Sequence, residues 1–357
     1  MLKKIRNMTL LATLLSLSVQ SYALPLKDIT QLYFFGDSLT DSGFNDLWPT
    51  IASPPQVPIL PAGKAPTFTS GYTWAQYVAR DIKGLPLPGA YPNPQPADTL
   101  TNNSIYARTP ITGFVSGTLQ GSNYAAGGSR THESGVSSTV WAPSLQQQIA
   151  YYLSGAEQTL DPQAIYFIWS GANDLLGLLF SAPPFPTQEQ FLVAANAAAI
   201  SITSEVAALS ARGAKRIVVL NLPNLGVTPL MSQLAALYQL PTLPNEMQAL
   251  TVGFNTLLST ELNSIDSTSE TKVLYIDIYS ILGSIIESTK AGQPYQVAGH
   301  TFLFTNYTEP ACAPASSALY CPSNAPTHYI FADALHPTDM QHQLLALFVE
   351  MQIEQWG

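Results

Sequence analysis

Short apolar runs alternate with longer amphipathic segments along this chain. Four runs are rich in β-branched or aromatic residues and end at turn formers; they occupy residues 31–35, 165–169, 216–222 and 272–278. Such runs predict buried strands, with a shorter one at 329–331. Three segments carry apolar residues at helical spacing and occupy residues 188–212, 245–263 and 338–355. Strands that alternate with helices predict an α/β fold, with a parallel sheet covered on both faces.

Two proline-rich segments interrupt this alternation. Residues 48–68 and 85–110 are dense in proline, which removes a backbone donor and fixes φ, so neither segment predicts one regular element. Long loops of this kind are either walls over a functional site or insertions without a role. Their apolar residues, among them Trp48 and Phe68, suit an acyl-chain wall and an ordinary core equally well. Because no linker separates two halves, we predict a single domain over residues 24–357.

The amino-terminal residues 1–23 have a pattern of their own. Three basic residues precede an apolar stretch at 10–19, and Ser21-Tyr22-Ala23 follows with small residues at its first and third positions. This pattern is typical of a cleaved secretory signal. A membrane anchor is the alternative, but the stretch is shorter than the roughly 20 residues that a spanning helix needs. We therefore expect a secreted protein, extracellular or periplasmic, that begins near Leu24 and keeps no transmembrane anchor.

The net charge narrows the range of partners. The chain has 14 Lys and Arg against 23 Asp and Glu, and loss of the three basic residues in 1–23 would change the formal charge from −9 to −12 (11 − 23). An acidic surface repels nucleic acid and anionic membranes. We therefore exclude nucleic-acid partners.

Two cysteines, Cys312 and Cys321, are the only ones in the chain. In an oxidising compartment, a close pair of this kind predicts a disulfide bond. A metal site is not expected, because no second Cys or His pair with ligand spacing lies nearby.

The strongest chemical signal is Gly36-Asp37-Ser38-Leu39, at the end of the first predicted strand. Open α/β sheets bind their ligands at the carboxyl edge of the strands. A serine there can point its hydroxyl into a crevice, where the amino terminus of a following helix stabilises developing negative charge. The alternative is that Ser38 or Thr40 only caps that helix.

A serine nucleophile needs a base, and the base needs an orienting carboxylate. The chain has five histidines, and Asp333-Ala-Leu-His336 supplies both partners three residues apart on a predicted loop. Asp339-Met-Gln-His342 repeats the spacing inside a predicted helix. There a structural role is expected, so we prefer His336 as the base.

Two further patches offer donors for an oxyanion. Asn173, in Gly171-Ala-Asn-Asp, follows a predicted strand and could offer its side-chain amide, although an ordinary Asn-Asp turn is the alternative. The glycine pair Gly127-Gly128 could lend a backbone N–H to the same oxyanion, but an isolated glycine pair is weak support for any role.

Together these four patches resemble the GDSL (SGNH) hydrolase family, in the family's order along nearly the whole mature chain. The resemblance implies a three-layer α/β/α sandwich with a parallel, flavodoxin-like central sheet. It also implies a catalytic triad of Ser38, Asp333 and His336, and an oxyanion hole formed by Ser38, Gly128 and Asn173. The chain has no Gly-x-Ser-x-Gly motif, which argues against the α/β-hydrolase fold.

The family pattern also separates the two glycines. It places the oxyanion glycine five residues after Asn123, which selects Gly128 rather than Gly127.

The resemblance implies a serine esterase that needs no metal or organic cofactor. It is closest to secreted bacterial lipolytic members, which include phospholipases A, lysophospholipases and glycerophospholipid:cholesterol acyltransferases. A lipid acyl ester is therefore the expected substrate, with cholesterol as a candidate acyl acceptor. The Cys312–Cys321 loop is similar to a disulfide loop that gates the site in some of these acyltransferases, and a plain structural staple is the equal alternative.

Two other functions remain open at this point. The first is a carbohydrate O-acetyl esterase, another activity of this family, which would favour short acyl groups. The second is a non-catalytic secreted binding module, against which the intact set of Ser, Gly, Asn, Asp and His argues.

Overall fold

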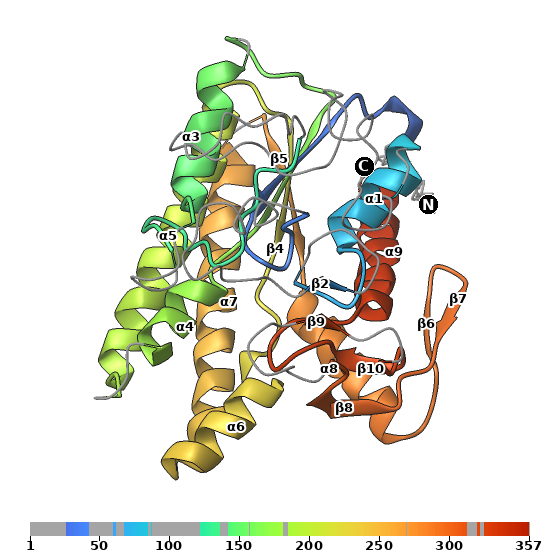
Figure 1. Cartoon of the computed structure of the whole chain (residues 1–357). Coiled ribbons are helices and arrows are strands. Elements are labelled where there is room, and N and C mark those ends of the chain that lie inside the picture. Colours follow the sequence, from blue (N-terminus) through green and yellow to red (C-terminus); the bar gives the residue numbers. More distant parts are fainter. Residues whose placement is uncertain are drawn as a thin grey trace, which may run out of the picture.

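In the described part of the chain, four parallel strands form the central sheet of the structure, which is a computed structural model (Figure 1). In spatial order they are β1 (Leu32–Gly36), β3 (Ile165–Trp169), β4 (Arg216–Leu220) and β5 (Lys272–Ile276). The residues that the structure describes are 26–42, 60–61, 68–84, 87, 122–135, 142–156, 158–180, 185–268, 270–312, 320–321 and 325–356.

A short segment extends the sheet beyond β1. Residues 122–126 run parallel to β1: Phe34 N–H donates to the Ser122 carbonyl (3.0 Å), and Tyr124 N–H donates to the Phe34 carbonyl (2.8 Å). Numbered along the chain, the spatial order of the five segments is 2-1-3-4-5. This is the flavodoxin-like order of doubly wound sheets.

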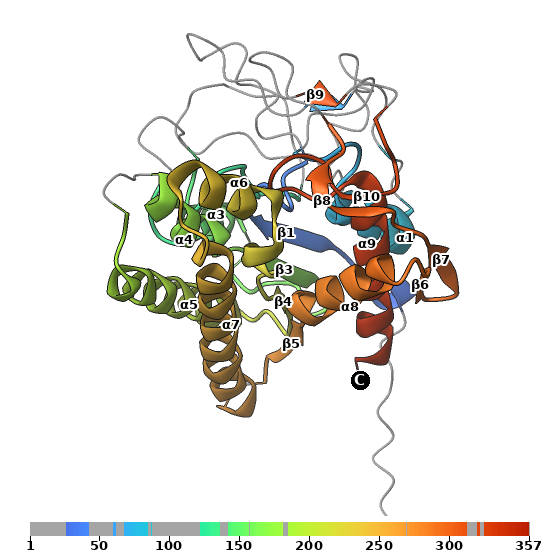
Figure 2. The ribbon, with the colours of Figure 1, turned by 90° about the horizontal axis from the view of Figure 1, so that it is seen from below.

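Helices cover both faces of this sheet (Figures 1 and 2). One face carries α3 (Leu145–Gly155), α4 (Ala172–Phe180), α5 (Gln188–Ala211) and α7 (Leu243–Thr268). The other face carries α1 (Trp74–Lys83) and α9 (Asp339–Gln355). Side chains of the strands alternate between the two cores: Ile168 packs with the first group, and Phe167 and Trp169 pack with the second. The expected three-layer α/β/α sandwich is therefore confirmed.

Several helices begin at polar caps that the sequence supplies. Ser144 and Thr187 form capping boxes with Gln147 and Gln190, which satisfies free N–H groups in the first turns of α3 and α5. α5 is also long and apolar enough to cross a membrane, a property that core helices of globular proteins share. One side of α5, with Ile202, is buried in the core beside the sheet, whereas Leu192, Val193 and Ile200 of the same helix are exposed.

The described residues form further short elements and two more helices. They are η1 (Leu26–Asp28), β2 (Leu60–Pro61), η3 (Leu225–Val227), α6 (Pro229–Tyr238), α8 (Ile278–Lys290), β6 (Tyr295–Val297), β7 (His300–Phe302), β8 (Asn306–Pro310), β9 (Tyr320–Cys321) and β10 (Tyr329–Phe331).

Several details differ from the elements predicted from the sequence: for example, the predicted strand 216–222 ends at Leu220, and the predicted helix 245–263 extends over Leu243–Thr268. The predicted strand 272–278 ends at Ile276, because Asp277 accepts a hydrogen bond from Ser280 N–H and caps α8. The strand predicted at 329–331 exists as β10, but it pairs in parallel with β8 and stays outside the central sheet.

Some expectations fall on residues that the structure does not describe. The signal segment 1–23 and most of the proline-rich segments 48–68 and 85–110 lie outside the described residues. The side chain of Cys321 is also outside them, so the bond between Cys312 and Cys321 stays a prediction. The helix expected after Ser38 is described only as far as a turn at residues 38–40.

Candidate active site

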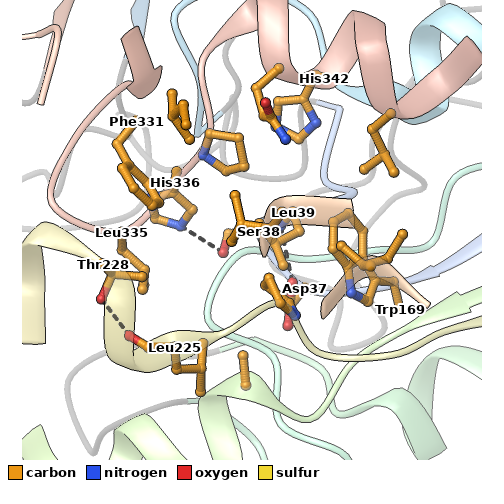
Figure 3. Close-up of a pocket in the computed structure, with 18 of the residues that line it drawn as sticks. Asp37, Ser38, Leu39, Trp169, Leu225, Thr228, Phe331, Leu335, His336 and His342 are labelled. Atoms are coloured by element: carbon orange, nitrogen blue, oxygen red, sulfur yellow. Dashed lines mark hydrogen bonds between the residues drawn. The ribbon is translucent and has the colours of Figure 1, made fainter. Parts of the chain in front are cut away.

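Ser38, His336 and Asp333 form one hydrogen-bonded chain (Figure 3 shows its first link). Ser38 Oγ lies 2.8 Å from His336 Nε2, and His336 Nδ1 lies 2.7 Å from Asp333 Oδ2. The other carboxylate oxygen of Asp333 accepts the backbone N–H groups of Leu335 (2.7 Å) and His336 (2.5 Å). One tight turn therefore places the acid beside the base, as the three-residue spacing suggests.

Burial and charge act in opposite directions on this pair. Burial by itself lowers the pKa of His336, but the charge of Asp333 and its hydrogen bond outweigh it, so the pKa of His336 is raised above its ordinary value. Burial would raise the pKa of Asp333, but the charge and hydrogen bonds of His336 hold that pKa below its ordinary value. The pair thus favours an ionised carboxylate that stabilises an imidazolium.

The turn that carries Ser38 is fixed by its neighbours. A Cβ on Gly36 would lie 2.1 Å from the Trp169 carbonyl oxygen at the end of β3, so only glycine allows this close approach. Gly36 N–H donates to Gln148 Oε1 (2.9 Å), and Gln148 Nε2 donates back to the Gly36 carbonyl (2.8 Å).

Gln148 is a site residue that sequence reasoning missed. Besides Gly36, its amide donates to Ser129 Oγ (3.0 Å), so one buried side chain of α3 joins the nucleophile turn to the glycine loop. Its sequence signal is weak but present: Gln148 is a polar residue on the same helix face as Leu145 and Ile149, which are apolar and buried.

The expected oxyanion donors gather at the same edge of the sheet. Gly127 N–H already donates to Asp41 Oδ2 (2.7 Å), whereas Gly128 has the left-handed φ of +81° that turns the next peptide. Asn173 lies in the first turn of α4 rather than in a loop, and its Nδ2 donates to the Ser129 carbonyl (2.9 Å). A side-chain amide has two N–H groups, so one remains for a substrate oxygen.

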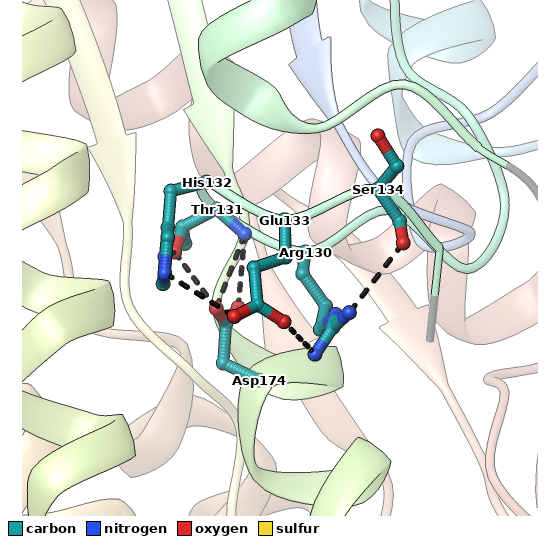
Figure 4. Close-up of polar contacts among 6 residues, drawn as sticks. All are labelled: Arg130, Thr131, His132, Glu133, Ser134 and Asp174. Carbon is teal, nitrogen blue, oxygen red and sulfur yellow. Dashed lines mark hydrogen bonds and ion pairs between the residues drawn. The ribbon is translucent and has the colours of Figure 1, made fainter. Parts of the chain in front are cut away.

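Asp174 holds the glycine loop from the same helix (Figure 4). Its carboxylate accepts the Thr131 hydroxyl (2.7 Å) and the Thr131 backbone N–H (3.1 Å). Burial raises the pKa of Asp174 to about 6, against the opposing effect of these hydrogen bonds. The Asn173-Asp174 pair therefore fixes residues 129–131 at two points.

A cavity of about 50 Å³ opens from the nucleophile (Figure 3). Ser38, His336 and Asn173 line it, together with a predominantly apolar wall. Part of that wall comes from α8, α9 and β10, namely Ile278, Ile281, Leu282, Ile330, Phe331 and Leu345. The ring of Phe68 lies 5.3 Å from the His336 ring, so one residue of the first proline-rich segment reaches the site.

The second Asp-x-x-His pair, Asp339 and His342, does not join the chain of bonds at Ser38. Asp339 accepts Tyr72 N–H (2.6 Å) and the Tyr77 hydroxyl (2.9 Å). His342 Nδ1 accepts Trp74 N–H (3.2 Å), and burial lowers the pKa of His342 to about 3. The structure thus brings His336, and not His342, to the serine.

A sequence model of the GDSL-like lipase/acylhydrolase family matches residues 32–349. The chain belongs to that family. Its members include a GDSL esterase/lipase of Arabidopsis thaliana that is 26% identical over 337 residues, which span 89% of this chain and 80% of the plant protein. A second GDSL esterase/lipase of Arabidopsis thaliana is 27% identical over 381 residues, spanning 94% and 92% of the two chains.

A solved structure is similar to this GDSL-family chain as well. A lipase from a goat rumen metagenome aligns with a TM-score of 0.43 and 14% identity, covering 92% of this chain and 98% of the lipase.

Proposed function

We propose that this GDSL-family ester hydrolase acts on acyl esters of lipids, with Ser38 as nucleophile, His336 as base and Asp333 as the carboxylate that orients the base. The observation that supports these roles is the bonded chain from Ser38 Oγ through His336 to Asp333. Ser38 N–H, Gly128 N–H and the Asn173 amide are the proposed oxyanion donors.

The proposed reaction has two steps. His336 Nε2 takes the Ser38 proton as Oγ bonds to the ester carbonyl, and the negative charge on the carbonyl oxygen is held by the three donors. The ester C–O bond then breaks, and the alcohol leaves with the proton from His336. In the second step, water gives a proton to His336 Nε2 as its oxygen bonds to the acyl carbon. The bond between that carbon and Ser38 Oγ then breaks, His336 returns the proton to Ser38 Oγ, and the acid leaves.

The apolar wall of the cavity supports a lipid substrate. Apolar residues such as Ile281, Leu282 and Leu345 line the space that adjoins Ser38 Oγ, so the carbon chain of a bound acyl group would be removed from water there. Phospholipids or lysophospholipids would supply such chains. With cholesterol in place of water, the second step would yield a cholesteryl ester.

The size of the cavity favours a second candidate function. A space of about 50 Å³ is far smaller than the 150 Å³ cavity that holds a benzene molecule. It suits acetyl or similarly short acyl groups, such as those of O-acetylated carbohydrates.

A chain-length series decides between the two. We would measure acid release from acetyl, butyryl, decanoyl and palmitoyl esters, and from phospholipid and lysophospholipid with and without cholesterol, using the Ser38→Ala variant as the blank. The lipid proposal expects Ser38-dependent release that rises with chain length, and a cholesteryl ester would establish acyl transfer. Release from acetyl esters alone would establish the short-acyl candidate and exclude lipids.

Secretion is also part of the proposal, with cleavage near Leu24 and a bond between Cys312 and Cys321. Amino-terminal sequencing of the protein recovered outside the cytoplasm tests the first point. The mass gained on thiol alkylation, with and without prior reduction, tests the second. An uncleaved amino terminus or two thiols that alkylate without reduction would contradict them.

A further inference from the structure

The cavity beside Ser38 is not apolar throughout. Two consecutive residues of α9, Gln341 and His342, line the same space as Ser38 and His336. Both side chains are more than nine-tenths buried, and the catalytic steps proposed above use neither. His342 belongs to the second Asp-x-x-His pair and is not hydrogen-bonded to Ser38, whose hydroxyl contacts His336 instead (Figure 3).

His342 offers a hydrogen-bond donor to this space. Its Nδ1 accepts Trp74 N–H, so the proton of the neutral ring must sit on Nε2. The ring stays neutral at ordinary pH, because burial and then the charge of His336 lower its pKa to about 3. No described residue is bonded to Nε2, which therefore remains a fixed N–H donor.

Gln341 offers the matching acceptor. Its Oε1 is buried and has no hydrogen-bond partner among the described residues. Its backbone is held in place, since Gln341 N–H donates to Thr338 Oγ1 (3.3 Å) at the cap of α9. A buried amide oxygen without a partner carries a free-energy cost that a bound ligand would remove.

We propose that Gln341 and His342 form a polar subsite that binds a hydroxyl group on the acyl chain of the substrate. A hydroxyl donates one hydrogen bond and accepts others, so it can satisfy both side chains at once. A carboxylate would not suit the site, because the described lining holds no Lys or Arg and includes Asp37. The inference rests on the proposed esterase activity, because the acyl group must be bonded to Ser38.

The size of the cavity limits the length of the hydroxyacyl group that it can hold. A space of about 50 Å³ holds about four small groups, at 10–15 Å³ for each water-sized group. A 3-hydroxybutyryl group has four non-hydrogen atoms beyond its carbonyl carbon and oxygen. We therefore choose the 3-hydroxybutyryl group, whose length fits this space and which carries its hydroxyl in the middle of the chain, as the test acyl group.

The test compares two esters that differ only in this hydroxyl, p-nitrophenyl butyrate and p-nitrophenyl 3-hydroxybutyrate. The wild-type protein should give a kcat/KM about tenfold or more higher for the hydroxy ester, because that ester alone pairs both buried groups. Gln341→Leu, which keeps the size of the side chain, should bring the ratio of the two values close to one. Gln343→Leu, on the same helix but outside the cavity lining, is the matched control and should keep the wild-type ratio.

A second variant and a second pair of esters allow the subsite to be tested even if the first variant or the first pair fails. His342→Phe should also remove the preference, and a thermal melt shows whether it folds despite the lost bond to Trp74. If butyrate is not cleaved, decanoate and 3-hydroxydecanoate esters serve as the pair. The wild type could cleave the plain ester in a Ser38-dependent way and still give equal kcat/KM values for the two esters. Gln341 and His342 would then hold only water. That result would overturn the subsite and leave the proposed esterase activity in place. No Ser38-dependent turnover of any ester would overturn both proposals.

Discussion

In the proposed mechanism, the charge state of the His336 imidazole sets the pH range in which the site can work. His336 must be neutral to take the Ser38 proton, and the carboxylate of Asp333 raises the pKa of His336 above the ordinary 6.5. Activity should therefore be lost as the pH falls through the pKa of His336, which lies above 6.5. At pH values well above that pKa, activity should reach its full level. A pH profile of kcat/KM on a soluble ester measures this limb. An acid limb centred below pH 6 would contradict the assignment of His336 as base.

Two aspartates near His336 provide variants with different expected effects. Asp333→Asn removes the bonded carboxylate, so the acid limb should move to lower pH and kcat should fall by about 10⁴, as in serine proteases. Asp37 also raises the pKa of His336, but only through its charge, and its own pKa is raised to about 7 by burial. Asp37→Asn should therefore shift the limb in the same direction with a much smaller loss of kcat. Equal losses in the two variants would contradict this distinction.

At the residue scale, the bonded chain was predictable because its members carry strong local signals. Ser38 follows a strand, and Asp333 and His336 lie three residues apart in a loop. The polar groups of Gln148, Gln341 and Asp37 were not assigned roles, because what matters about them is burial and partners, and these depend on tertiary packing. The same sequence spacing at Asp339 and His342 does not produce a hydrogen-bonded pair at the serine, because Asp339 lies in a helix and accepts hydrogen bonds from Tyr72 and Tyr77.

At the scale of elements, one side chain of α3 positions the turn that carries the proposed nucleophile. Gln148 bonds both peptide groups of Gly36 and the hydroxyl of Ser129, so it sets the distance between the nucleophile turn and the glycine loop. Gln148→Leu should lower kcat by about 10–100-fold, with a smaller change in KM, and should destabilise the fold by about 1–3 kcal/mol through the unpaired backbone groups. Gln146→Leu, on the exposed face of the same helix, should change neither. Steady-state kinetics and urea unfolding check both variants, and an unchanged kcat in Gln148→Leu would contradict a positioning role.

The elements themselves were predictable to the degree that their periodicity is strong. The apolar strands β1, β3, β4 and β5 and the long helices follow their predicted runs closely. The edge segment 122–126 was not predicted as a strand, because its sequence Ser-Asn-Tyr-Ala-Ala is small and partly polar. Its pairing is set by β1, and by Asn123, whose Nδ2 donates to the Thr40 carbonyl (2.8 Å) and to Ser42 Oγ (2.8 Å). Such pairing is a property of tertiary structure that no local pattern carries.

At the scale of the whole molecule, the two cores share the strands of one sheet and should therefore unfold together. Phe167 points from β3 into the core beneath α1 and α9, where its ring lies 4.8 Å from Phe34 and 5.5 Å from Trp74. Its neighbour Ile168 points into the opposite core. Phe167→Ala should cost about 3–5 kcal/mol of unfolding free energy through lost contacts and the cavity that remains. Leu237→Ala, at a side chain that is 70% exposed, should cost less than about 0.5 kcal/mol. Calorimetry and circular dichroism should each show one transition in both variants, because damage to one core weakens the sheet that supports the other. Two separate transitions in Phe167→Ala would show that the two layers fold independently, and would contradict the single domain predicted over residues 24–357.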